Sequence, residues 1–221
     1  MSHLRPNTLY AYQLEAEDTA GQQSVSELGT FRTQPVKLTL TRTGGTDTTL
    51  QTRIDRNVAG LTGVTLTVAS RSWTSLPPGD AISSSLPDHA TSASVARLLP
   101  NLTYYAQVSG TETVAGTSVT SAVFPLKTLP VPLTLVSSQI TRNSATFTFT
   151  STSAGTGGMK IGTGSNHRSF SYTYATETGT RHIVTVKGLS AKTSYSAHAV
   201  LRQSHGNEAG LSAKISFRTP R

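Results

Sequence analysis

The sequence contains no cysteine, which excludes a disulfide framework and a thiolate metal site. Charged residues make up only 14% of the 221 positions, and only 11 side chains are acidic. This composition argues against a long helical bundle and against a calcium site built from several carboxylates. No stretch approaches the roughly 18 apolar residues of a membrane helix. Catalytic motifs such as G-x-S-x-G, H-E-x-x-H and G-x-x-x-x-G-K are absent as well.

What the chain does have is serine and threonine, at roughly three positions in ten, which favours strands over helices. The net charge of +8 is unevenly distributed. It amounts to −2 over residues 1–34, +2 over residues 35–129 and +8 over residues 130–221. A positive field of this kind favours anionic partners such as acidic glycans or envelope polymers, although it also serves solubility.

One seven-residue segment occurs three times. Each copy has a leucine and a tyrosine six positions apart, with proline or alanine two residues after the leucine. The copies are LRPNTLY at 4–10, LLPNLTY at 98–104 and LSAKTSY at 189–195. A second signature, Phe-Arg-Thr or Leu-Lys-Thr, ends 23 or 24 residues after each tyrosine, at Thr33, Thr128 and Thr219. The chain therefore contains an internal repeat of 91 to 95 residues.

Apolar and polar residues alternate after each tyrosine. The apolar positions are Tyr10, Tyr12, Leu14 and Ala16; Tyr104, Ala106 and Val108; and Tyr195, Ala197, Ala199 and Leu201. A period of two is typical of a strand with one face on a core. Similar short runs fill each repeat, at 38–40, 49–54 and 64–68, and at 133–135, 145–150, 159–161 and 184–186. They predict seven short strands per repeat in an antiparallel β-sandwich, with no helix longer than a turn.

The repeated residues resemble the fibronectin type III family. The Leu-x-Pro-x-Thr-x-Tyr segment is similar to the corner between the E and F strands of that family, and Phe-Arg-Thr is similar to its last strand. The resemblance implies an all-β protein of tandem immunoglobulin-like sandwiches, of the kind found in bacterial surface, secreted and phage structural proteins. It divides the chain into a partial repeat at 1–34, a domain at 35–129 and a strongly basic domain at 130–221.

Two features of the family are absent. The second strand of neither full repeat carries a tryptophan, since the only one is Trp73, and the adhesive tripeptide Arg-Gly-Asp does not occur. Binding of the integrin type is therefore not expected. The strands at about 63–95 and 157–180 are the least clearly defined by the pattern.

Residues 1–34 match only the last two strands of a repeat. A two-stranded hairpin is not stable alone in water, so Tyr10, Tyr12, Leu14 and Phe31 need a surface to cover. One interpretation is a truncated part of a longer array. The other is a hairpin that completes a partner's sheet by strand addition.

Two features are candidate binding surfaces. Phe170, Tyr172 and Tyr174 share one face of a strand, where they would stack on sugar rings if exposed. A core position is the preferred interpretation, because large aromatic side chains dominate sandwich interiors. The second feature is a basic set for an anionic partner, consisting of Lys160, Arg168, Arg181, Lys187, Arg202 and Lys214. Basic residues on a sheet also prevent edge pairing.

Other chemistry has little support. The six histidines stand apart with few acidic neighbours, so neither a metal site nor a cofactor is expected. Glu15, Glu17 and Asp18 form the only acidic cluster, on a solvated strand face. Asn101 begins a glycosylation sequon, but the turn geometry of the repeated corner explains it equally well. Nucleic acid is disfavoured, because the basic residues match no RNA-binding signature.

The sequence thus predicts a non-enzymatic structural or adhesive protein of an extracellular surface or a virion, such as a phage tail or capsid-decorating component. It would act as a spacer and as a protein-binding or glycan-binding element, with other copies, other proteins of the assembly or anionic glycans as partners. If Met1 is the true start, the missing signal peptide favours a virion component. The alternative is a set of accessory linker domains in a secreted polysaccharide-degrading enzyme.

Overall fold

The computed structural model describes residues 4–57, 60–73, 79–163, 171–203 and 206–221. These residues form antiparallel strands and no helix, which confirms the predicted all-β class. Within them, accordingly, no helix is long and apolar enough to span a membrane. The chain divides into two compact units, one of residues 1–44, 51–94 and 104–126 and one of residues 45–50, 95–103 and 127–221. The domain boundaries at 34/35 and 129/130 stay predictions.

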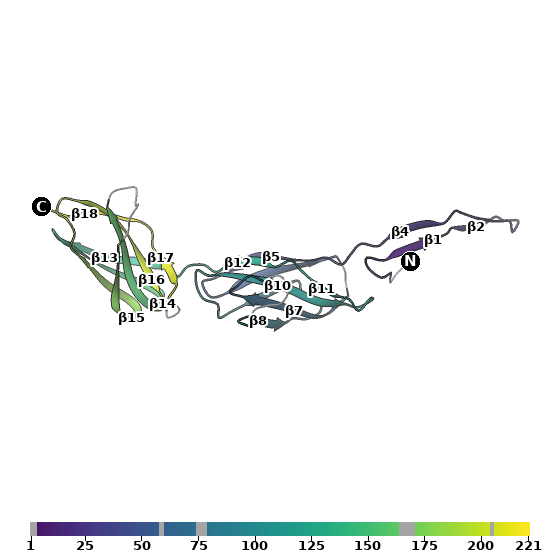
Figure 1. Ribbon diagram of the computed structural model, residues 1–221, viewed down its shortest axis with the longest axis horizontal. Helices are drawn as coiled ribbons and strands as arrows, with labels where there is room; N and C mark the ends of the chain where they lie inside the picture. The colour runs from purple at the N-terminus through teal and green to yellow at the C-terminus, as the bar shows by residue number, and fades with distance from the viewer. Residues whose placement is uncertain (1–3, 58–59, 74–78, 164–170, 204–205) are drawn as a thin grey trace. The chain divides into compact units, whose positions relative to one another are not determined.

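The middle repeat has the predicted two-layer arrangement (Figure 1). One sheet has the order β5-β6-β9, and its strands are β5 (Leu38–Gly45), β6 (Leu50–Arg56) and β9 (Ser92–Val95). The other has the order β11-β10-β7-β8, with β12 also paired to β10. Its strands are β7 (Leu61–Ala69), β8 (Ile82–Ser85), β10 (Thr103–Glu112), β11 (Ser118–Thr120) and β12 (Phe124–Lys127).

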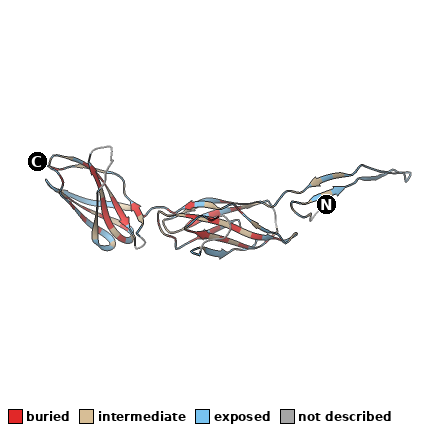
Figure 2. Ribbon diagram, viewed as in Figure 1, coloured by how far each residue is buried: buried red, intermediate tan, exposed pale blue. Residues whose placement is uncertain are grey.

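Alternation along β10 forms the core of this repeat as predicted. Tyr104, Ala106 and Val108 are buried, while the residues between them are partly exposed (Figure 2). Ile54 on β6 and Leu66 on β7, from the two sheets, are buried almost completely. Each such side chain contributes about 1.5–3 kcal/mol on burial, so side chains of this kind hold the two layers together.

The C-terminal repeat departs from seven short strands. Its strands are β13 (Leu133–Ile140), β14 (Ser144–Thr163), β15 (Ser171–Lys187), β16 (Ser194–Arg202), β17 (Glu208–Leu211) and β18 (Ile215–Arg218). Residues 145–151 of β14 pair with β13, and residues 156–163 pair with β16. Strand β15 likewise pairs with β14 at both ends, and the register shifts between Thr150 and Gly155. Two long strands therefore replace four short ones, because the glycines around 155–158 let the chain bend without ending the strand.

Aromatic side chains fill the C-terminal core. Phe147 and Phe149 on β14 are completely buried. Phe217 on β18 packs edge-on against Phe147 and stacks on Tyr195, with ring centroids 5.5 Å apart in both cases. Tyr195, Ala197, Ala199 and Leu201 are all buried, as the alternation predicted, but Ser196 and Val200 on the other face are buried as well. The expected solvent-facing side of this strand is therefore partly covered.

The N-terminal segment forms two short hairpin sections, as its two-strand pattern predicted. Strand β1 (Leu9–Tyr12) pairs with β4 (Gly29–Arg32), and β2 (Glu15–Glu17) pairs with β3 (Gln23–Val25). None of its described residues reaches the burial of the two sandwich cores. Its apolar side chains are mostly exposed.

Candidate binding surface

The aromatic run and part of the basic set, which are separate features of the sequence, come together on one sheet of the C-terminal repeat. Tyr172 on β15 pairs with Lys160 on β14, and Lys160 pairs in turn with His198 on β16. Tyr174 is the partner of Gly158, next to the position where Arg202 pairs with Thr156. Adjacent antiparallel strands thus place aromatic and basic side chains from three strands side by side.

The four side chains form a continuous cation–aromatic ladder, defined by Lys160, Tyr172, Tyr174 and Arg202. The two tyrosine rings are stacked with centroids 6.2 Å apart and planes inclined by 10°. The Lys160 ammonium lies 5.5 Å from the centroid of Tyr172, and the Arg202 guanidinium lies 4.4 Å from that of Tyr174. Each cation–π contact is worth about 0.5–1 kcal/mol at an exposed site, so the rings hold both cations in place.

Gly158 makes room for this ladder. A Cβ atom at this position would come within 2.5 Å of Cδ1 of Tyr174, so the ring lies directly over the glycine. Any side chain at residue 158 would push the ring away from its stack and from Arg202. The glycine is needed here for the close approach of a ring rather than for its backbone freedom.

Tyr172 corrects the preferred sequence interpretation. It is 47% exposed, and Tyr174 is half-buried, so neither ring belongs to the core. Phe170 lies outside the described residues. Alternation identifies which residues share a face of a strand, but it does not say which of the two faces meets the other sheet.

The other basic residues are not part of the ladder. Arg181 and Lys187 are exposed on the later part of β15, where they pair with Thr150 and Ser144. Lys214 is exposed between β17 and β18. Arg168 lies outside the described residues. Of the basic set, the structure therefore brings only Lys160 and Arg202 onto the aromatic rings.

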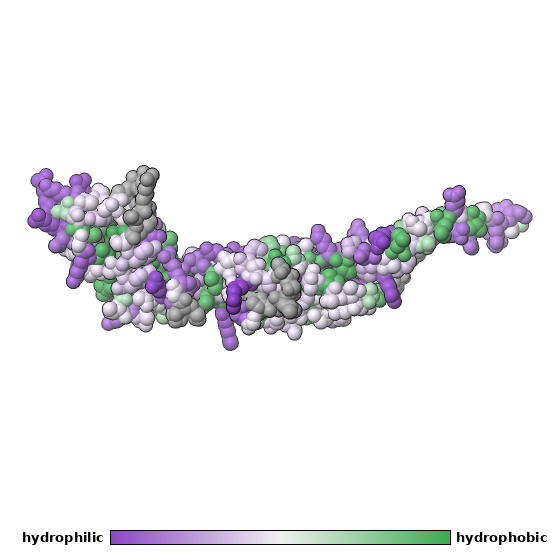
Figure 3. Space-filling model, in the orientation of Figure 1, coloured by the Kyte–Doolittle hydropathy of each residue, from purple (hydrophilic) through white to green (hydrophobic). Residues whose placement is uncertain are grey.

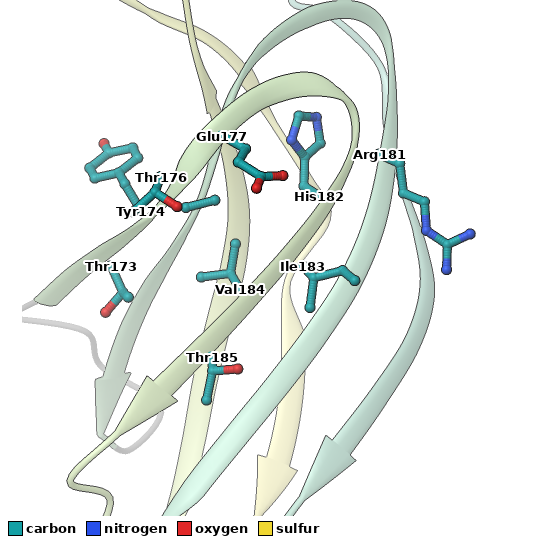
Figure 4. Close-up of a pocket in the computed structure, with 10 residues that line it drawn as sticks. Thr173, Tyr174, Thr176, Glu177, Arg181, His182, Ile183, Val184 and Thr185 are labelled. Carbon is teal, nitrogen blue, oxygen red and sulfur yellow. The ribbon is translucent and has the colours of Figure 1, made fainter.

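Next to the ladder, the two arms of β15 enclose a groove of about 600 Å³ (Figure 4). Tyr174, Glu177, Arg181 and Ile183 are among the residues that line it. Glu177 is one of only two acidic residues between positions 130 and 221, the other being Glu208. The candidate binding surface therefore continues from the ladder into this groove, which has polar and apolar side chains and the carboxylate of Glu177.

His182 lines the groove but belongs to the core. Only 2% of the residue is exposed, its ring packs 4.9 Å from that of Phe149, and its Nε2 lies 2.9 Å from Oγ of Ser151. Burial lowers the pKa of His182 below its usual value of 6.5, so the ring is neutral at pH 7. Among the described residues, no three His, Asp or Glu side chains gather to hold a metal ion.

The repeated corner has the turn geometry expected for Asn101. Asn7, Asn101 and Lys192 occupy the same position in the three copies, and their φ angles are 49°, 52° and 55°. Asparagine tolerates this left-handed conformation better than most residues. The turn thus accounts for Asn101 without a glycan.

No protein-family model and no curated protein matches this chain. Among solved structures, a segment of two fibronectin type III domains from chicken tenascin is similar, at 19% sequence identity and a TM-score of 0.47. The match covers 82% of this chain and 97% of that one. The chain's own strand order in the middle repeat, with sheets β5-β6-β9 and β11-β10-β7-β8, is that of a two-sheet antiparallel sandwich, as the sequence resemblance implied. The fold of the chain is therefore that of tandem β-sandwiches.

Proposed function

We propose that this chain is a non-enzymatic module of an extracellular surface or virion assembly, which acts as a spacer and binds an anionic glycan. The observation that carries the proposal is the cation–aromatic ladder of Lys160, Tyr172, Tyr174 and Arg202. It lies in the part of the chain that holds the whole net charge of +8.

The ladder fits the chemistry of an acidic sugar polymer. Sugar rings have apolar C–H faces that pack on the exposed side of Tyr172, and carboxylate or sulfate groups pair with Arg202 and Lys160. Because the aromatic rings already favour these positions of the two cations, less side-chain entropy is lost when a ligand binds than for free surface cations. The surrounding positive field raises the local concentration of a polyanion.

The test is calorimetric titration of the full chain with polygalacturonate, with dextran as the neutral comparison. We expect polygalacturonate to bind and Tyr172→Ala to weaken that binding at least tenfold, because both the stacking surface and the support for Lys160 are lost. Lys187→Ala is the matched control, since it removes an exposed cation of the same strand that lies outside both the ladder and the groove. It should reduce binding less than threefold.

Three results would count against the proposal. Equal losses in Tyr172→Ala and Lys187→Ala would indicate a diffuse charge effect instead of a site. Equal binding of single-stranded DNA would indicate a general polyanion surface. A preference for dextran would favour the alternative of accessory domains in a polysaccharide-degrading enzyme.

A further inference from the structure

The N-terminal hairpin has the same hydrogen bonds as the last strand pair of both complete repeats. In all three copies a threonine hydroxyl donates to a backbone carbonyl at the start of the corner and accepts a backbone amide. The donated bonds are Thr33 to Arg5 at 2.6 Å, Thr128 to Leu99 at 2.7 Å and Thr219 to Ser190 at 2.6 Å. The accepted amides are those of Thr8, Leu102 and Thr193, at 2.9–3.0 Å.

A second set of bonds recurs further along the strands. In each copy a serine Oγ accepts the amide of an apolar residue on the neighbouring strand, and the serine amide donates back to that residue's carbonyl. The pairs are Leu14 with Ser26, Val108 with Ser121 and Ala199 with Ser212. The three serine hydroxyls also donate to the carbonyl of the following residue, at 2.8–2.9 Å.

The aromatic pair of the hairpin matches that of the C-terminal repeat. Tyr10 lies opposite Phe31 with centroids 5.7 Å apart, as Tyr195 lies opposite Phe217 at 5.5 Å. The Tyr10 hydroxyl accepts the amide of Arg5 at 2.7 Å, and the Tyr195 hydroxyl accepts that of Ser190 at 2.8 Å. The hairpin is therefore, in its local geometry, the last strand pair of a sandwich.

The hairpin and the last strand pair of the C-terminal repeat differ in what covers their inner face, which in the hairpin carries Tyr12, Leu14 and Phe31. In the C-terminal repeat this face belongs to a buried cluster that includes Phe147 and Phe149. In the hairpin, Tyr12 is 39% exposed and Leu14 is 66% exposed. Figure 3 shows hydrophobic residues at the surface of this segment. Such a face is energetically unfavourable in water without a partner.

The inner face of the hairpin also has side chains of the sizes found on one sheet of a sandwich core. Tyr12 lies opposite Gly29, and its ring occupies the space above the glycine. At the same position the C-terminal repeat has Ala197 opposite Ile215. In the hairpin the large residue is on the first strand and the small one is on the second, whereas the C-terminal repeat has the reverse order. Each pair therefore provides one large side chain to the interior. Pairs of this kind preserve the layer that an opposing sheet needs.

We propose that the hairpin, residues 4–34, docks onto a polypeptide segment that supplies the strands equivalent to β13, β14 and β15, and so completes a sandwich around Tyr10, Tyr12, Leu14 and Phe31. Both complete repeats of the chain cover this face with such strands. A second copy of the hairpin fits less well, because Glu15, Glu17 and Asp18 would bring like charges together. This inference is independent of the glycan-binding proposal.

The test mixes the full chain with a synthetic polypeptide that has the sequence of residues 130–188. Hydrogen exchange of residues 9–32 is then followed by mass spectrometry. We expect exchange in the hairpin to slow at least tenfold when the polypeptide is present. A second form of the chain, Tyr12→Ala with Gly29→Ile, copies the Ala197 and Ile215 pair and should be protected more strongly.

The controls separate docking from local folding. Phe31→Asp places a carboxylate on the inner face and should abolish protection, while Leu9→Asp places one on the outer face of the same hairpin, opposite Arg32, and should not. No protection in either the natural chain or the Tyr12→Ala, Gly29→Ile form would overturn the proposal. Dimerisation of the full chain in light scattering that Phe31→Asp abolishes would overturn it too, in favour of a second copy.

Discussion

At the scale of single residues, His182 gives the C-terminal sandwich a pH dependence. Burial lowers its folded pKa below 6.5, the value expected for the unfolded chain. The unfolded chain therefore binds a proton more readily than the folded one. The stability due to the neutral ring is fully present above pH 6.5 and is lost as the pH falls from 6.5 through the lower folded pKa.

The first prediction follows from this linkage. Urea unfolding of the C-terminal sandwich, monitored by hydrogen exchange within 144–187, should give a lower free energy of unfolding at pH 5 than at pH 7.5. His182→Phe should remove most of this difference, because phenylalanine fills the same space without binding a proton. His89→Gln is the control, since His89 is exposed in the middle repeat. An unchanged pH dependence in His182→Phe would show that another group is responsible.

At the scale of strands, the sequence predicts those elements that show regular alternation or that recur in the repeat. Strands β10 and β16, the repeated corner and the N-terminal hairpin lie where the pattern places them. The continuity of β14 and β15 could not be predicted, because glycines such as Gly155 and Gly179 normally indicate turns. The exposure of Tyr172 depends on which face the opposing sheet covers, and this is a property of the folded repeat.

The second prediction concerns the threonine whose hydrogen bonds join the end of the last strand to the repeated corner. Thr219 is buried, and its hydroxyl donates to the carbonyl of Ser190 and accepts the amide of Thr193. Thr219→Val keeps the shape but leaves both backbone groups without this partner, so the C-terminal sandwich should lose about 1–3 kcal/mol. Thr134→Val, at an exposed position of β13, should change the stability by less than about 0.5 kcal/mol. Equal effects in denaturant titrations would contradict the role of Thr219.

At the scale of the whole molecule, the spacing of the repeat predicts two sandwiches with separate cores. In the C-terminal sandwich, the buried cluster around Phe147 and Phe149 draws its residues from positions 145–199, with partly buried neighbours between 133 and 217. Ile54 and Leu66 of the middle repeat are buried in the other compact unit. The cation–aromatic ladder could not be predicted, since it depends on side chains that three strands bring together.

The third prediction uses the single tryptophan as a reporter. Trp73 lies in the middle repeat and is buried, so its fluorescence follows the unfolding of that sandwich. Phe147→Ala removes a completely buried ring from the C-terminal core and should destabilise that sandwich by about 3–5 kcal/mol. The urea midpoint of Trp73 fluorescence should stay unchanged, while the loss of strand circular dichroism divides into two steps. A parallel shift of the fluorescence midpoint would mean that the two sandwiches unfold as one cooperative unit, and the predicted boundary at 129/130 would then not separate independent domains.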